Sequence, residues 1–249
     1  MKILLTNDDG IDSAGLLMLA ASLGKKHEVY LSAPDGQRSG YSHYIRFHQA
    51  VFAEERQVVG AKAAYALSGS PADCVMFAIR HLGIKPDIVI SGPNNGANMA
   101  FDIIYSGTVG AAQQGAILGY KSVALSCAAH SHCVFESCVD FIENNLNKLY
   151  NFNYNKGLLN INVPNLPYKE IKGVKITVQG YRLFSDRYDI KDEEGKKAYY
   201  LEGLPQDVDD DELTTDVSAL KHGYISITPL TLDRTHHTIM DRTKEYFCK

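Results

Sequence analysis

The chain has 249 residues, 45% hydrophobic and 22% charged, with five cysteines and a formal net charge of −4. A chain of this length and composition buries a core without disulfides or a structural metal, which excludes wholesale disorder, and its slight acidic excess argues against a nucleic-acid partner. No apolar run approaches the roughly 20 residues of a membrane helix, and Asp8 and Asp9 come before a signal core could form, so we expect a cytoplasmic protein with no membrane partner.

The first two thirds of the chain alternate short apolar runs with helical patterns. Residues 3–6 are a predicted strand, Asp12 or Ser13 can cap a helix with apolar residues at a period of 3.6, and residues 29–33 are a second strand. The alternation continues with strands at 63–67, 87–91, 122–126 and 158–163 and helices at 71–83, 107–118 and 137–149. It predicts an α/β fold, a Rossmann-like, mostly parallel sheet with helices on both faces.

The last third has a different pattern. Residues 181–203 are rich in charge and tyrosine around a turn signal at 192–195, which predicts a projecting β-hairpin. The other predicted features are an extended segment at 174–179, a solvated acidic loop at 207–212, a strand at 224–228 ended by Pro229, and a tail from Leu232 that packs on another subunit or frays. We therefore expect one domain, 1–249, with an α/β core at 1–165 that carries the active site and a hairpin, returning strand and oligomerisation tail at 166–249.

Polar residues follow the first predicted strand, as Asn7-Asp8-Asp9-Gly10. Two adjacent carboxylates beside an apolar strand repel each other and lose hydration, and a hard cation such as Mg²⁺ or Mn²⁺ relieves both penalties. The alternative for this motif is a turn followed by a helix cap, where Asp and Asn are common. The motif alone leaves both interpretations open.

Two further loops at the same edge of the sheet carry hydroxyl and carboxamide groups. Ser39 and Gly40 follow the second strand, and Asn94 and Asn98 follow the strand at 87–91. Ser106-Gly107-Thr108 stands where a helix should start, which suits either phosphate binding or a plain cap. Ligands of doubly wound sheets bind beyond the carboxyl ends of the strands, so one cation beside one phosphate would use all three loops.

At these residues the sequence resembles the SurE family, the survival protein E nucleotidases. The matching stretches occur in order along residues 1–230, and as a set they are far more specific than any one motif. They are Asn-Asp-Asp-Gly at 7–10, Arg-Ser-Gly at 38–40, Gly-Ser-Pro-Ala-Asp-Cys-Val at 69–75, Ser-Gly-Pro-Asn-Asn-Gly-Ala-Asn at 91–98, Asp102, Tyr-Ser-Gly-Thr-Val at 105–109, Asn-Ile-Asn-Val-Pro at 160–164, Thr-Asp-Val at 215–217 and Gly-Tyr-Ile-Ser-Ile-Thr-Pro-Leu at 223–230.

The resemblance implies a metal-dependent phosphatase acting on nucleoside 5′- and 3′-monophosphates, with polyphosphate as a further substrate in some members. It implies one divalent cation, Mg²⁺ or Mn²⁺ with Ca²⁺ as an option, and a homodimer or homotetramer that exchanges its C-terminal segment. The implied metal ligands are Asp8, Asp9, Ser39 and Asn94, and the positions that match the phosphate pocket of the family are Asn98, Ser106, Gly107 and Thr108. We also expect Gly40 to bind substrate, and Asp8 or Asp9 to be catalytic by orienting the attacking water or taking its proton, with Asp8 favoured.

Two positions depart from the family pattern. Ala100 stands where the family loop usually has a second glycine, so we expect either a negative φ or some backbone strain there. The hairpin turn reads Asp192-Glu193-Glu194-Gly195 instead of an Asp-Pro-Arg-Gly-like turn, which leaves the geometry of the hairpin open.

Two other classes of protein would use part of the same pattern. A receiver domain in signalling also has an acidic pair after its first strand and binds Mg²⁺, but it needs an aspartate after its central strand, where this chain has Ser91-Gly92-Pro93-Asn94. A nucleotide-binding module without turnover would need the same phosphate pocket and no catalytic group.

Overall fold

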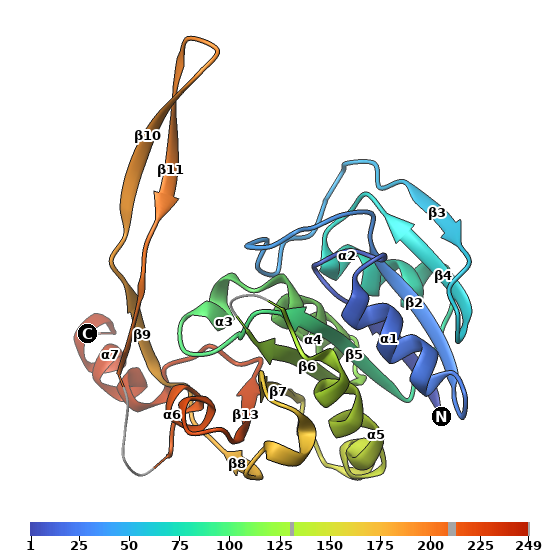
Figure 1. The fold of residues 1–249 in the computed structure, drawn as a ribbon. Helices are drawn as coiled ribbons and strands as arrows, with labels where there is room; N and C mark the ends of the chain where they lie inside the picture. The colour runs from blue at the N-terminus through green and yellow to red at the C-terminus, as the bar shows by residue number, and fades with distance from the viewer. Residues whose placement is uncertain (130–131, 209–212, 249) are drawn as a thin grey trace.

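The computed structural model describes residues 1–129, 132–208 and 213–248. A nine-stranded sheet in the order β3-β4-β2-β1-β5-β6-β7-β13-β8 forms its centre (Figure 1). Its strands are β1 Lys2–Thr6, β2 Glu28–Pro34, β3 Ala53–Arg56, β4 Ala61–Leu67, β5 Ile88–Asn95, β6 Lys121–Ala128, β7 Gly157–Pro164, β8 Val174–Ile176 and β13 Ile225–Thr231.

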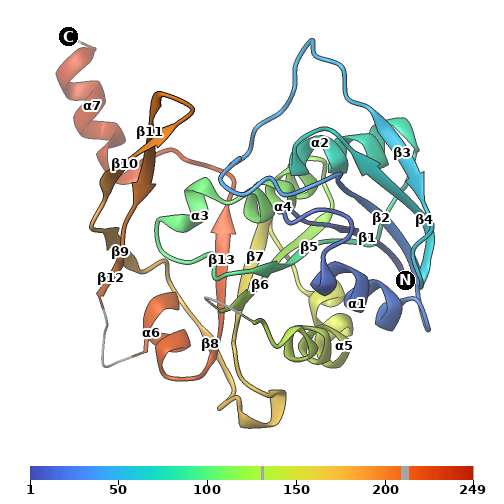
Figure 2. The ribbon, with the colours of Figure 1, turned by 45° about the horizontal axis from the view of Figure 1, so that its top comes forward.

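Helices cover both faces of the sheet, as the alternation in the sequence predicted (Figures 1 and 2). The helices are α1 Ala14–Leu23, α2 Pro71–Met76, α3 Asp102–Tyr105, α4 Gly107–Ile117, α5 Phe135–Asn151, α6 Asp216–Lys221 and α7 Met240–Phe247. Leu16 of α1 and Phe141 of α5 pack in one core cluster with strand residues, and Val75 of α2 and Ala111 of α4 pack in another on the opposite face. The prediction of a mostly parallel α/β sheet is confirmed, because β1, β2, β4, β5, β6 and β7 pair in parallel.

The sheet does not end with the predicted core. β13 pairs antiparallel with β7 and parallel with β8, so two strands from beyond residue 165 complete it. The expected end of β13 at Pro229 was wrong, because the strand continues to Thr231. The pairing between β8 and β13 ends at Ile227 of β13. Beyond Ile227 this side of β13 is a sheet edge, so Pro229, which lacks an N–H, removes no hydrogen bond between strands.

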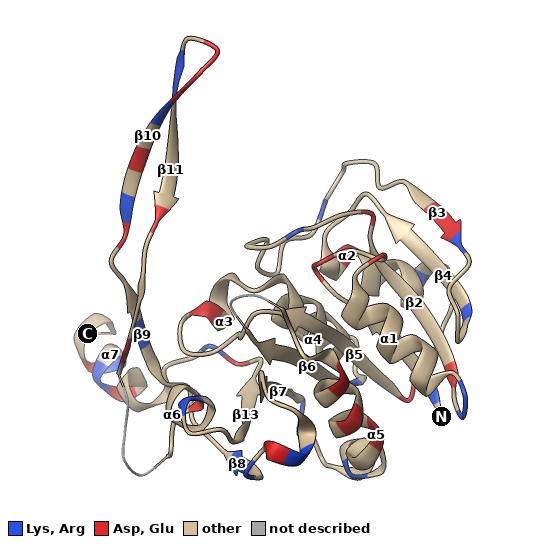
Figure 3. Ribbon diagram, viewed as in Figure 1, with Lys and Arg blue, Asp and Glu red and all other residues tan. Residues whose placement is uncertain are grey.

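The charged segment forms the predicted hairpin, which stands away from the sheet (Figure 1). Its base is β9 Tyr181–Phe184 paired with β12 Pro205–Val208, and its arm is β10 Arg187–Glu193 paired with β11 Lys196–Glu202. Glu194 and Gly195 both have positive φ, +53° and +79°, as a two-residue type I′ turn requires. Figure 3 shows that acidic and basic residues are interspersed along this arm.

Other differences from the predictions are local. The helix expected over 71–83 is α2 followed by a π-helical turn at Phe77–His81, and the exposed edge strand β3 was not predicted because it has no buried face. Ser13, and not Asp12, occupies the N-cap position of α1. Asp207 and Val208 of the predicted acidic loop lie in β12, and the rest of that loop, residues 209–212, falls outside the described residues. In the described parts of the chain, no helix has the length and apolar character needed to cross a membrane.

Candidate active site at the carboxyl edge of the sheet

The acidic pair lies at the carboxyl end of β1, between β2 and β5. The side chain of Asn7 shapes this turn, because its Oδ1 accepts the N–H of Gly10 (3.1 Å) and its Nδ2 donates to the carbonyl of Gly10 (2.9 Å) and to Oγ of Ser13 (2.6 Å). This local bonding fixes the backbone that presents Asp8 and Asp9, and it occupies the Ser13 oxygen that the sequence offered as a helix cap.

Asp8 is buried, with 3% of its surface exposed, and it faces the first turn of α4. The hydroxyl of Thr108 donates to Oδ1 of Asp8, and the N–H of Arg38 donates to its carbonyl (2.6 Å). Burial raises the pKa of Asp8 to about 6, the hydrogen bond from Thr108 opposes this shift, and the charge of Asp9 adds to it. Asp8 therefore connects the loops that follow β1 and β2 to the start of α4.

Gly107 makes this close approach possible. A Cβ atom at Gly107 would lie 2.9 Å from Cβ of Asp8 and 3.1 Å from its Oδ2, closer than carbon atoms pack in proteins. Ser106 caps α4, since its Oγ accepts the N–H of Val109 (3.0 Å). The predicted Ser106-Gly107-Thr108 segment thus lies directly beside the predicted carboxylates.

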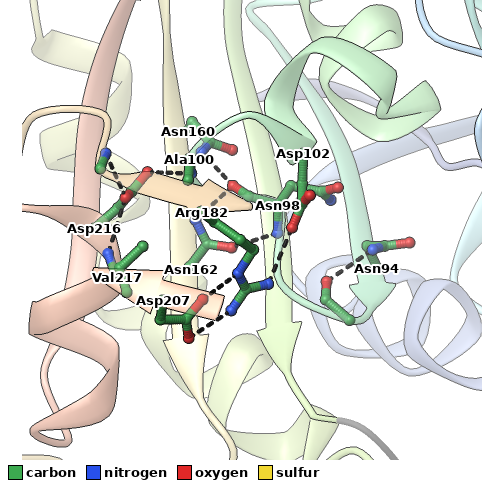
Figure 4. A network of polar contacts seen from close by, with 12 residues as sticks. Asn94, Asn98, Ala100, Asp102, Asn160, Asn162, Arg182, Asp207, Asp216 and Val217 are labelled. Carbon is green, nitrogen blue, oxygen red and sulfur yellow. Dashed lines mark hydrogen bonds and ion pairs between the residues drawn. The ribbon is translucent and has the colours of Figure 1, made fainter. Parts of the chain in front are cut away.

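Asp9 is more exposed than Asp8 and turns toward the loop after β5. The N–H of Asn95 donates to Oδ2 of Asp9 (3.0 Å), and burial raises the pKa of Asp9. Neighbouring Asn94 donates its Nδ2 to the carbonyl of Gly96 (2.7 Å), while its Oδ1 has no hydrogen-bond partner within the described chain and points away from the network in Figure 4. An amide oxygen in this state is available as a neutral ligand.

Ser39 and Gly40 lie on the loop after β2 and are both exposed. Arg38 anchors this loop to Asp8 through its backbone, and Oγ of Ser39 accepts a hydrogen bond from Nε2 of Gln37 (3.0 Å). A Cβ atom placed on Gly40 would have no other atom within 4 Å, so the space beside this residue is open. Ser39 and Gly40 thus follow directly after the residue that contacts Asp8, and both are open to solvent.

The donor set suits a hard cation. Among the described residues neither Asp8 nor Asp9 forms an ion pair, although burial raises the pKa of both. Two carboxylates with an amide and a hydroxyl oxygen nearby are typical ligands of Mg²⁺, Mn²⁺ or Ca²⁺. No cluster of three or more His, Cys, Asp or Glu was found in the described chain, as expected for a set with only two such residues.

Asn98 lies in a different environment from the one its predicted substrate contact implies. It is 7% exposed, its Nδ2 donates to Oγ of Ser126 (2.8 Å), and its N–H donates to Oδ1 of Asn162 (2.8 Å). Nδ2 atoms of Asn160 and Asn162 donate back to the carbonyl of Asn98, at 2.7 and 3.0 Å (Figure 4). Its direct contact with substrate stays a prediction, and its observed bonds hold the loop after β5.

Several residues that shape the site carried no assigned role in the sequence analysis. Asn95 binds Asp9, Asn160 and Asn162 hold Asn98, and Asp216 accepts the N–H of Ala100 (3.0 Å). All four lie within the family-like stretches, but a motif names neither the partner nor the atom. The contacts of Asp216 and the two β7 asparagines also span at least 62 residues, beyond any local pattern.

Known protein families provide an independent observation. The family model described as "Survival protein SurE" matches residues 3–186. The chain belongs to the SurE family. A "5′-nucleotidase SurE" from Petrotoga mobilis is 39% identical to it, with 99% of each chain covered, and one from Pelotomaculum thermopropionicum is 40% identical, covering 98% of this chain and 95% of that one.

The SurE fold extends over the whole chain. The crystal structure of the SurE protein from Aquifex aeolicus has a TM-score of 0.83 and 35% identity, with 99% of each chain covered. The resemblance inferred from the motifs is therefore confirmed, whereas the receiver interpretation has no support in any of these matches.

Proposed function

We propose that this SurE chain is a divalent-metal-dependent phosphomonoesterase that hydrolyses nucleoside 5′-monophosphates to nucleoside and phosphate. The observation that carries the proposal is the adjacent carboxylates of Asp8, which is buried, and Asp9, which is half-buried. Neither has a cationic partner in the described chain, and Asp8 lies against the N-terminus of α4. A cation placed there and a helix terminus beside it both favour a phosphate group. The relatives named 5′-nucleotidase supply the substrate class.

Asp8, Asp9, Asn94 and Ser39 would hold the cation, with Mg²⁺ or Mn²⁺ preferred and Ca²⁺ an option. A divalent cation held by these residues would supply Lewis-acid polarisation of the phosphate and make a water molecule easier to deprotonate. The raised pKa of Asp8, about 6, still leaves this carboxylate ionised at neutral pH. Asp8 can therefore bind the cation and orient the attacking water or accept its proton, with Asp9 as the second carboxylate.

The phosphate itself would be held by the start of α4 and the adjoining loop. The N–H of Gly107 has no acceptor among the described residues, and the dipole of the 11-residue α4 favours negative charge at this end. Ser106, Thr108, Gly40 and Asn98 complete the proposed substrate pocket. Donors aimed at the phosphoryl oxygens in this way stabilise the charge that redistributes in the transition state.

Three further properties belong to the proposal. The same site accepts nucleoside 3′-monophosphates, and polyphosphate is a further candidate substrate. The chain assembles into a homodimer or homotetramer through its hairpin and tail, because α7 buries no residue in the single chain and Tyr246 and Phe247 are each 76% exposed. Light scattering tests the assembly, and a strictly monomeric protein would contradict it.

The activity is tested by phosphate release from a panel of nucleoside 5′- and 3′-monophosphates and polyphosphate, each with Mg²⁺, Mn²⁺ or Ca²⁺. We expect release from AMP with Mn²⁺ or Mg²⁺, its loss with a chelator, and a loss of at least about 10²-fold in Asp8→Asn. Binding of AMP without release would favour the non-catalytic nucleotide-binding module. Full activity of Asp8→Asn would refute the site assignment.

A further inference from the structure

Residues 96–106 join the two halves of the proposed site. They start beside the metal-ligand candidate Asn94 and end at Ser106, which caps the helix of the phosphate pocket. Contacts from the C-terminal half of the chain hold this segment from its other side (Figure 4). Its position therefore depends on residues outside the active site.

Ala100 is the point of highest backbone cost in this segment. Its φ is +48°, in the left-handed region that a side chain makes unfavourable, so the expected strain at this departure from the family pattern is present. The residue is fully buried and packs with Met99, Val217 and Leu220. A strained conformation persists only where surrounding contacts determine it.

Asp216 supplies that contact. It is fully buried at the start of α6, and its Oδ2 accepts the N–H of Ala100 (3.0 Å). Its Oδ1 accepts the N–H groups of Gly180 (2.8 Å) and Val217 (2.9 Å). One carboxylate thus connects the active-site segment, the chain that leads into the hairpin, and α6.

We propose that Asp216 is a positioning residue of the phosphate pocket, which holds Ala100 in its left-handed conformation and thereby fixes α3 and the start of α4. This inference rests on the proposed function. The proposal adds to the pocket a residue 108 positions beyond Thr108, which acts through the backbone of Ala100.

The effect should be confined to phosphate, because a second set of bonds isolates the metal half. Asn160 and Asn162 hold Asn98 on both its N–H and its carbonyl, between Ala100 and Asn94. Toward Ser106 the support is weaker: Phe101 packs edge-to-face on Tyr181, and Asp102 accepts a single bond from Nη1 of Arg182 (3.0 Å), against three bonds to the backbone of Asn98. A displacement at Ala100 is therefore passed on toward Ser106 more readily than toward Asn94.

Asp216→Asn tests the proposal with little change of shape. The amide oxygen can still accept from Gly180 and Val217, but the amide nitrogen then faces the N–H of Ala100, so one hydrogen bond becomes a donor-donor contact. A hydrogen bond to a charged group lost in this way corresponds to about a tenfold change in an equilibrium constant or more. We expect the KM for AMP and the inhibition constant of inorganic phosphate to rise about tenfold, while calorimetry gives a Kd for Mn²⁺ within about twofold of the wild type.

Rescue separates positioning from general damage. Ala100→Gly removes the side chain that makes a positive φ costly, so in the Asp216→Asn background it should restore most of the phosphate affinity. Asp87→Asn is the matched control, because Oδ2 of Asp87 also accepts a backbone N–H, that of Lys2 (2.7 Å), at the opposite end of β1. It should leave KM and phosphate inhibition unchanged.

Unchanged phosphate affinity in Asp216→Asn, a parallel loss of Mn²⁺ affinity, or no rescue by Ala100→Gly would each overturn the proposal. If Asp216→Asn does not fold, hydrogen exchange of the wild type decides: the Ala100 amide should exchange as slowly as amides of β7, and rapid exchange refutes the bond. If the wild type hydrolyses no nucleotide, the proposed function fails, whereas Mn²⁺ and phosphate binding still test the role of Asp216.

Discussion

Replacing Asp8 with asparagine should make the metal-free protein more stable at neutral pH while it removes activity. The pKa of Asp8 is about 6 in the fold, because the carboxyl is buried, against about 4 in an unfolded chain. A carboxyl whose pKa is higher in the folded state binds its proton more tightly there, so stability falls as pH rises from about 4 to about 6. Asparagine keeps an acceptor for the Thr108 hydroxyl and carries no charge.

The size of the effect follows from the two pKa values. A shift of about two units corresponds to about 3 kcal/mol of unfolding free energy above pH 7, and about half of that at pH 5, where the folded carboxyl is mostly protonated. Because the group is almost fully buried, solvent screening reduces the figure little.

Urea unfolding in the presence of a chelator at pH 7.5 and pH 5 measures this gain. Asp140→Asn, an exposed change on α5, is the control and should leave the unfolding free energy unchanged at both pH values. Saturating Mn²⁺ should reverse the order at pH 7.5, because only the wild type binds the cation tightly. An Asp8→Asn protein that is less stable than the wild type in chelator, or equally affected at both pH values, would refute this reasoning.

Four further changes test the geometry of the site and of the hairpin. Gly107→Ala should lower kcat/KM by at least about tenfold, because the new Cβ would lie 2.9 Å from Cβ of Asp8. Gly36→Ala is the control and should have little effect, since its new Cβ would have one contact, at 3.6 Å from Nη1 of Arg38. Equal activities of the two variants would contradict the predicted clash with Asp8. The affinity of the metal-free protein for Mn²⁺ should fall up to about tenfold per pH unit below about pH 6, because Asp8 takes up a proton there. Calorimetry measures this affinity, and a constant value from pH 7 to pH 5 would contradict the prediction. Arg182→Met should lower the unfolding free energy, measured in urea, by about 2 kcal/mol. This is less than the loss on breaking a fully buried ion pair, because the side chains of its partners Asp102 and Asp207 are 21% and 33% exposed. An unchanged unfolding free energy would show that these ion pairs do not stabilise the fold. Glu194→Asn should stabilise the hairpin by about 0.5 kcal/mol, seen as slower proteolysis of the arm, and faster cleavage would contradict the turn assignment.

The sequence predicted the fold where hydrophobic pattern alone decides it. β1, β2, β5, β6 and β7 are buried runs between helical patterns, so their type and their succession along the chain could be deduced. β3 buries no residue, so it has no apolar alternation to detect. α7 also buries none in the single chain, although its few apolar residues gather on one face of the helix. The continuation of β13 past Pro229 depends on where β8 stops, which is a tertiary fact.

The candidate site was predictable in its parts but not in its connections. Asp8, Asp9 and the Ser106–Thr108 segment were found because carboxylates and helix starts have recognisable sequence patterns. The hydrogen bond from Thr108 to Asp8 joins residues 100 positions apart, and that from Ala100 to Asp216 joins residues 116 apart. Such bonds depend on the packing of the whole sheet, which no local spacing encodes.

The place of β13 in the sheet has a consequence for how a nascent chain matures. β13 inserts between β7 and β8, although it is made after both, so β8 has no partner in the main sheet until residue 225 and beyond have been synthesised. β1, which leads directly into both aspartates, can pair in parallel with β2 and β5 much earlier. The chain therefore acquires its acidic pair early in translation and closes its last sheet positions only after about nine tenths of its length has been made.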